Sequence, residues 1–184
     1  IFQMVYLAPF ILKFTSNCPM RKILLILFTV VLTGTIQAQV IFSESFDAET
    51  FLPPGWVGSK YSSSGGAIDW DRVTAGSNPE VLPHSGAGMA RYNTLNAPIE
   101  ANAQINTPAL NFSSGGSYRV RFWMYRGDAT PSASDELSVY VSTSPYYIGG
   151  TLLQKIYTIR TLAPLESTNG WYQYSYEIPA KYNT

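Results

Sequence analysis

Residues 118–125, YRVRFWMY, alternate in a way that decides the fold of this chain. Every second residue from Tyr118 to Met124 is apolar or aromatic and would share one face. The residues between them, Arg119 to Tyr125, would face the other way. A period of two residues is the pattern of a β-strand with one buried face.

The same period recurs on both sides of this stretch. It is clearest in residues 136–142, where Leu137, Val139 and Val141 would point inward, and it returns in residues 152–160 and 171–178. Clusters of Gly, Pro, Ser and Asn separate these runs, as turns do. About eight short strands indicate an all-β chain, an antiparallel β-sandwich or jelly roll. Shorter candidate strands are Val40–Phe46, Trp70–Thr74, Gly88–Asn93 and Ala109–Phe112.

Composition supports one folded domain. Hydrophobic residues make up 46% of the 184 residues and charged residues 13%, a balance that excludes a disordered chain. Three basic residues, Lys13, Arg21 and Lys22, precede residue 39; the other 9 basic residues face 12 acidic ones, a net charge of −3. Nucleic-acid binding usually needs a basic stripe, so we expect no nucleic-acid partner.

Residues 20–38 have the order of a cleavable signal peptide. Basic residues follow Met20, an apolar run spans Ile23–Leu32, and small residues end at Ala38, so we expect a signal helix cleaved before Gln39. The apolar run is shorter than the roughly 20 residues of a membrane span, so we expect no span in the mature chain. The protein is therefore expected to be secreted or held at the cell surface.

Two further expectations concern the ends of the chain. Residues 1–19 are an upstream segment of doubtful status, and translation starts at Met4 or Met20. The only cysteine, Cys18, lies in this part, so the mature chain would have no disulfide. Residues 39–184 form the domain, and its C-terminal strand or strands are expected to follow Thr184.

Catalysis has few candidates. His84 is the only histidine, and it lies among turn residues, so a serine triad or a zinc site has little to build on. Gly86-Ala87-Gly88 lacks the third glycine and the helix of a dinucleotide loop. We therefore expect no enzyme activity within this chain.

Carboxylates form a more informative set, and three interpretations are open. They could be a calcium site, a pair of acids for glycoside hydrolysis, or solvated strand ends. The acids concerned are Glu44, Asp47, Asp69, Asp71, Asp135 and Glu136.

Aromatic residues either fill the core or bind ligand. Tyr146 and Tyr147, between Pro145 and Gly149-Gly150, are predicted to form an exposed loop tip, where a sandwich usually carries recognition. They are the candidate ligand-binding residues. The core is expected to include Phe42, Phe46, Trp56, Trp70, Tyr118 and Phe122.

Several motifs together resemble the cleaved-adhesin or choice-of-anchor J domains, which are distantly similar to MAM domains. Such modules occur in the adhesin regions of gingipains and in surface proteins that use type IX secretion. The motifs are Phe42-Ser43-Glu44-Ser45-Phe46-Asp47, Leu52-Pro53-Pro54-Gly55-Trp56, Trp70, His84-Ser85-Gly86-Ala87-Gly88-Met89-Ala90, Asn106-Thr107-Pro108-Ala109-Leu110, Tyr118–Tyr125 and 135–142.

This resemblance implies a jelly roll with structural calcium, Ca2+, and a non-catalytic adhesive role in a larger surface protein. By motif match the ligands would be Glu44, Asp47 and Asp135, with Asp69 or Asp71 as a further one. The partner would be an extracellular protein or a glycan. The alternative is a carbohydrate-binding module appended to an exported hydrolase or peptidase.

Overall fold

A computed structural model describes residues 2–3, 39–63, 65–95, 97–98, 100–112, 116–127 and 135–183. The predicted signal peptide at 20–38, Cys18 and both candidate start residues lie outside these ranges. The described part is all-β, with a single 3-10 turn at Ala180–Tyr182. No helix in it is both long enough and apolar enough to cross a membrane.

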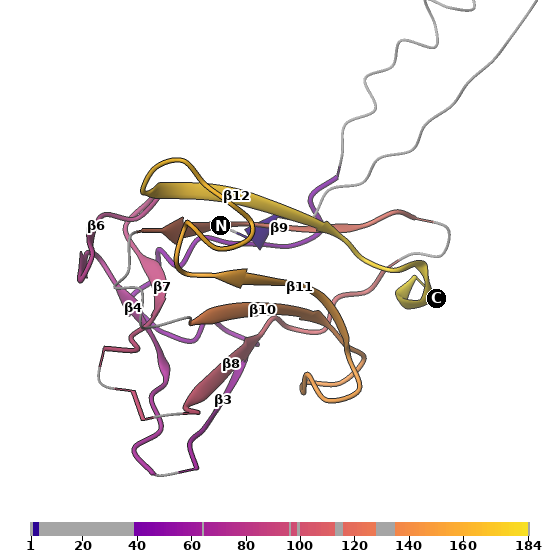
Figure 1. The fold of residues 1–184 in the computed structure, drawn as a ribbon. Helices are drawn as coiled ribbons and strands as arrows, with labels where there is room; N and C mark the ends of the chain where they lie inside the picture. The colour runs from indigo at the N-terminus through magenta and orange to yellow at the C-terminus, as the bar shows by residue number, and fades with distance from the viewer. Residues whose placement is uncertain are drawn as a thin grey trace, which may run out of the picture.

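The described strands pair two by two. The pairs are β1–β2, β3–β8, β4–β7, β5–β6, β9–β12 and β10–β11, and every one of them is antiparallel (Figure 1). The prediction of antiparallel strands is therefore confirmed. The strands are β1 (Phe2–Gln3), β2 (Ser43–Glu44), β3 (Val57–Tyr61), β4 (Trp70–Val73), β5 (Gly76–Ser77), β6 (Glu80–Val81), β7 (Met89–Tyr92), β8 (Asn102–Asn106), β9 (Arg119–Arg126), β10 (Glu136–Val141), β11 (Thr151–Tyr157) and β12 (Gly170–Glu177).

The core lies between the β9–β12 pair and the β10–β11 pair, which Figure 1 shows one above the other. Its buried members are Phe122, Ile156 and Tyr174, one from each of three strands, and Phe122 lies directly opposite Tyr174 in the β9–β12 register. The alternation seen in β9 thus selects the buried face, as a half-buried strand requires. Partly buried side chains around this core are Val120, Met124, Leu137, Val139, Tyr172 and Tyr176.

The opening stretch folds around a second apolar cluster. Trp56 donates its backbone N–H to the carbonyl of Pro53 over 3.0 Å, which closes the Pro-Pro-Gly-Trp corner. The Phe46 and Trp56 rings, both buried, lie 5.5 Å apart edge to face. These two predicted core residues are confirmed, and Phe42 is half-buried beside Trp56.

Some strand predictions are wrong. Residues 109–112 form no strand, and of Val40–Phe46 only Ser43–Glu44 is extended and paired, here with β1. β3 and β8 were missed because their sequences, VGSKY and NAQIN, are short and contain few large apolar residues. These two segments are strands because they pair with each other, and the residue pattern of a single segment does not reveal its partner.

Arg126, at the end of β9, is fully buried and holds the loop between β11 and β12. Its Nη2 donates to the carbonyls of Ile159 at 2.5 Å and Leu162 at 2.8 Å, and its Nη1 donates to the carbonyl of Pro164. Nη1 also donates to the hydroxyl of Tyr174 at 3.0 Å. One guanidinium therefore donates to three backbone carbonyls of the loop, of which the carbonyl of Ile159 also accepts from the N–H of Leu162.

Candidate functional site

Glu44 and Asp47, at the end of β2, both accept hydrogen bonds from backbone amides. Glu44 Oε1 accepts from the N–H of Phe46 over 2.6 Å, and Asp47 Oδ1 accepts from the N–H of Ala87 over 2.5 Å. The Ala87 N–H lowers the pKa of the Asp47 carboxyl below its ordinary value, with smaller contributions from Ser45 and others. Asp47 thus ties the segment after β2 to a loop that is distant in the sequence.

Arg72, on β4, completes this Asp47 junction, which we define as residues 46, 47, 72 and 86–88. Its Nε donates to the carbonyl of Phe46 at 2.6 Å, and its Nη2 donates to the carbonyls of Asp47 at 2.9 Å and Ala87 at 3.2 Å. Gly86 has φ +71° and packs against the Asp47 carboxylate, where a Cβ would overlap it. The glycine-rich segment therefore serves close backbone approach.

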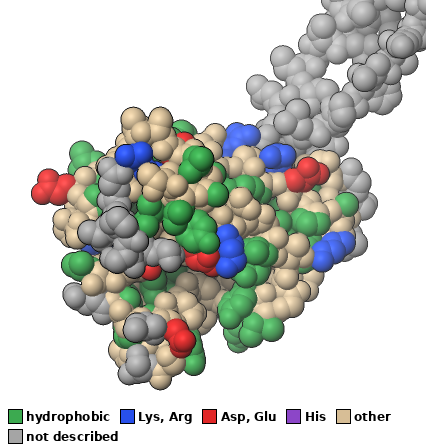
Figure 2. Space-filling model, viewed as in Figure 1, with side chains coloured by type: hydrophobic (Ala, Val, Ile, Leu, Met, Phe, Trp, Pro, Cys, Tyr) green, Lys and Arg blue, Asp and Glu red, His purple; other side chains and the backbone are tan. Residues whose placement is uncertain are grey.

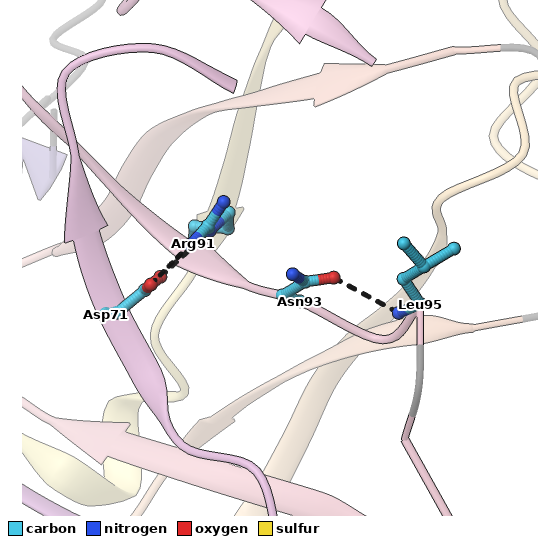
Figure 3. Close-up of polar contacts among 4 residues, drawn as sticks. All are labelled: Asp71, Arg91, Asn93 and Leu95. Atoms are coloured by element: carbon cyan, nitrogen blue, oxygen red, sulfur yellow. Dashed lines mark hydrogen bonds and ion pairs between the residues drawn. The ribbon is translucent and has the colours of Figure 1, made fainter. Parts of the chain in front are cut away.

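Asp71 is engaged by an arginine on the neighbouring strand (Figure 3). Its two oxygens accept from Arg91 Nε at 3.0 Å and from Nη2 at 2.6 Å, which is a bidentate pair across β4 and β7. Asp71 is also the first cause of the raised pKa of Arg91. Beyond β7, Asn93 Oδ1 accepts from the N–H of Leu95 over 3.1 Å and shapes the turn.

Asp69 and Asp135 act on one hydroxyl. Burial raises the pKa of Tyr92, and the charges of Asp135 and Asp69 raise it further. The Tyr92 hydroxyl is buried and has no hydrogen-bond partner in the described part of the chain. Asp69 also pairs with Lys60 over 3.3 Å. Asp69 and Asp135 are thus the two members of the predicted set whose charges both raise the pKa of Tyr92.

The five predicted calcium ligands do not form one shell in the structure. Among the described residues no group of three or more His, Cys, Asp or Glu side chains is placed to hold a metal ion. Calcium usually takes six to eight oxygen ligands, several of them carboxylates. Asp71 is paired with Arg91, Asp47 accepts from the N–H of Ala87, and Asp69 is paired with Lys60.

The predicted loop tip is exposed. Tyr146, Tyr147 and Ile148 have exposed fractions of 61%, 48% and 76%, and they connect β10 to β11. The Tyr147 ring packs on Tyr140 with 5.5 Å between centroids, and Tyr140 lies opposite Leu152. We call these five residues the tip patch. Three of its members, Tyr140, Ile148 and Leu152, were not identified from the sequence as binding residues.

A β-bulge shapes the tip patch. Val139 pairs with Gln154 but Tyr140 pairs with Leu152, so β11 contains one extra residue, Leu153. The register shift turns Leu152 to the solvent side beside Tyr140, and bulges often redirect side chains at functional sites. Such a shift leaves no signal in the sequence of either strand.

Polar contacts hold the backbone of the tip in place. The carbonyl of Pro145 accepts from Gln104 Nε2 on β8 at 3.0 Å, and the carbonyl of Tyr147 accepts from the N–H of Gly150 at 2.8 Å. Ser144 Oγ donates to the carbonyl of Tyr146 at 3.2 Å. The aromatic rings are therefore displayed on a braced hairpin, which lowers the entropy that binding would cost.

His84 is a packing residue on the outer face of β9 and β12. Its ring stacks on Trp123 with 3.8 Å between centroids and meets Trp171 edge to face at 6.0 Å. The indole N–H of Trp171 donates to the carbonyl of Leu82 over 3.0 Å. These contacts attach the loop before β7 to the sheet, a role that the sequence did not indicate.

No protein-family model matches the chain, and neither the curated proteins nor the solved structures contain a match to it.

Proposed function

We propose that this chain is a non-catalytic binding module of a secreted or cell-surface protein, a jelly-roll β-sandwich of the cleaved-adhesin kind. The tip patch is the observation that carries the proposal. Its five large apolar side chains gather on one hairpin, and contiguous exposed apolar patches commonly mark interaction sites. Tyrosines at a rigid loop tip suit an extracellular protein or a glycan, because they combine a flat apolar face with a hydroxyl.

The surface charge supports recognition by shape and aromatic contact. On the face seen in Figure 2, Lys and Arg side chains are interspersed with Asp and Glu side chains, and hydrophobic side chains lie between them. A mixed surface of this kind gives weak long-range steering. Affinity would then depend on the aromatic anchors, as it does at most binding hot spots.

Loss of binding on removal of the two tip tyrosines is the test. We expect the purified chain to bind a glycan array or immobilised extracellular proteins, and the double variant Tyr146→Ala, Tyr147→Ala to lose that binding. Leu165→Ala is the matched control, because Leu165 is 75% exposed and lies outside the tip patch. Equal binding by the double variant would show that the tip patch is not the site.

The glycan array also separates the two candidate functions. Binding to arrayed sugars that depends on the tip tyrosines would favour the carbohydrate-binding module. A silent array together with tyrosine-dependent binding to a protein would favour the adhesion module. The aromatic tip suits either partner, because stacking on a sugar and packing on a protein use the same ring faces.

Structural calcium belongs to the same proposal, in a narrower form. Asp69 and Asp135 would supply carboxylate oxygens near the unpartnered hydroxyl of Tyr92. An ion there would stabilise a sandwich that has no disulfide, because a ligand of the folded state raises stability. Glu44, Asp47 and Asp71 are not needed for this version, and Asp69 would exchange its ion pair with Lys60 for the bound ion.

Thermal unfolding with added calcium or a chelator tests the ion. We expect calcium to raise the melting temperature, and Asp135→Asn to abolish the increase. Asp71→Asn should keep the increase, because Asp71 is held by Arg91. An unchanged melting temperature of the original chain in both conditions would refute the calcium part and leave the binding part standing.

A further inference from the structure

β3 is an exposed edge strand. All five of its residues, Val57–Tyr61, are exposed, and they pair with β8 along one side only. Among the described residues, no backbone group outside β8 forms a hydrogen bond with the backbone of this strand. Figure 1 shows the β3–β8 pair at the end of the molecule away from β12. An unpaired edge is a template for another strand.

The two faces of β3 differ. Val57, Ser59 and Tyr61 share the outer face, and the two apolar members have exposed fractions of 50% and 59%. Gly58 and Lys60 share the other face, where Lys60 forms its ion pair with Asp69. Both large apolar side chains thus flank a small polar residue at the centre of the strand.

We propose that β3 pairs with β3 of a second copy of this chain, antiparallel, about a two-fold axis at Ser59. In this register Val57 lies opposite Tyr61 of the other copy at both ends, and Lys60 lies opposite Gly58. Pairs of an aromatic and a β-branched residue are favourable across strands, and no like charges oppose each other. An edge that is complementary to itself gives a closed two-fold dimer.

The register is restricted by the pleat. A continuous antiparallel sheet keeps outer residues opposite outer residues, so the strand can shift only by steps that preserve the faces. The register centred on Ser59 is the one of these that pairs all five residues. A foreign extended peptide could use the same edge, but the match of VGSKY with itself favours a second copy.

The dimer should be weak. One five-residue pairing is small beside the interface of roughly 800 Å² per partner found in stable complexes. We therefore expect a concentration-dependent equilibrium between monomer and dimer. Sedimentation velocity of the purified chain over a range of concentrations should show it, and a monomer at every soluble concentration would overturn the proposal.

A pair of opposite charge variants tests the register. Val57→Glu and Tyr61→Lys each put a charge opposite an apolar side chain, so each alone should weaken the dimer by about tenfold. An equimolar mixture of the two should dimerise again. In the mixed dimer one end carries a Glu–Lys pair and the other keeps the original Val–Tyr pair. A dimer that neither variant weakens, or that the mixture fails to restore, would overturn the proposal.

Controls separate a loss of the dimer from a loss of folding. Both positions are exposed, and such substitutions usually leave stability almost unchanged, which far-UV circular dichroism will verify. Leu165→Lys adds a charge at an exposed site elsewhere and should leave the dimer intact. If either test variant unfolds, Ser59→Glu takes its place, because it sets two like charges across the axis. That variant should also dissociate the dimer, and an intact dimer would overturn the proposal.

Discussion

Arg126 Nη1 donates a hydrogen bond to the hydroxyl of Tyr174 over 3.0 Å, and that hydroxyl in turn donates to Glu166 Oε1 over 3.2 Å. A buried cation is thereby connected to a carboxylate through a tyrosine. Burial is the first cause of the raised pKa of Tyr174, and the arginine acts against it. Burial and Glu166 thus favour the protonated hydroxyl, and the hydroxyl links the guanidinium to a carboxylate.

Replacing Arg126 should destabilise the fold strongly. Arg126→Met removes the donor to the carbonyls of Leu162 and Pro164 and one of the two donors to the carbonyl of Ile159, so we expect a loss of about 3–5 kcal/mol in the free energy of unfolding. Chemical denaturation measures it. Arg119→Met is the control, because its pair with Glu177 is long at 4.0 Å and its two hydrogen bonds to Ser175 are only partly buried, so it should cost about 1 kcal/mol. Similar losses for the two variants would contradict this role.

A comparison of two glycines tests the Asp47 junction. Gly86 and Gly65 have similar φ angles, +71° and +79°, but only Gly86 packs against another residue, Asp47. Gly65→Ala should cost about 1–2 kcal/mol from the left-handed backbone alone. Gly86→Ala should cost about 1–3 kcal/mol more, because its methyl group would overlap the carboxylate. The excess should shrink in an Asp47→Ala background, and an excess that persists there would place the conflict elsewhere.

Acid should loosen the same junction. The lowered pKa of Asp47 means that its contribution to stability is present above its ordinary value of 3.8 and is lost as the pH falls through the lower value of the folded state. Asp47→Ala should remove this dependence and speed amide exchange at Ala87 by about tenfold or more. The amide of Ala97, bonded to the carbonyl of Thr94, should exchange at an unchanged rate. Hydrogen exchange followed by NMR would show both.

Alkaline pH should destabilise the core. Burial raises the pKa of Tyr176 from 10.0 to about 12, with a further contribution from Tyr174. Between these values the unfolded chain loses the proton and the folded chain keeps it, so the free energy of unfolding should fall as the pH rises. Tyr176→Phe should make the decline shallower in denaturation curves across this window. Tyr146→Phe, at an exposed position, is the control and should leave the decline of the unfolding free energy with pH unchanged. An equal effect of the two variants would show that Tyr176 is not the source of the decline.

The sequence predicted the parts of this fold that repeat a local pattern. The apolar side chains of β9 and β10 were placed on the correct face, because a half-buried strand imposes a period of two. The tip tyrosines were found because Pro and Gly flank them. β3 and β8 were missed, since two polar strands are stabilised by their pairing across 49 residues from Val57 to Asn106.

Site residues followed the same division. The acids at strand ends were recognised as a set, but their partners were not. Arg72, Arg91 and Arg126 each lie on a strand, and nothing in their local sequence says which distant carbonyl or carboxylate they meet. The bidentate pair of Asp71 and Arg91 depends on the register of β4 and β7, which is a property of two strands together.

The pairing of β3 with β8 also has a kinetic meaning. It closes a loop that contains the complete β4–β7 and β5–β6 pairs, so the closure brings together residues far apart in the chain. Closing such a loop costs the chain conformational entropy before the contacts form and stabilise it. Proteins rich in contacts of this kind therefore fold slowly, in milliseconds to seconds. The free edge of β3 would thus be completed late in folding. Two newly made chains would then meet only after β3 has paired with β8 in each of them. This order favours pairing of two folded edges over aggregation of unpaired strands.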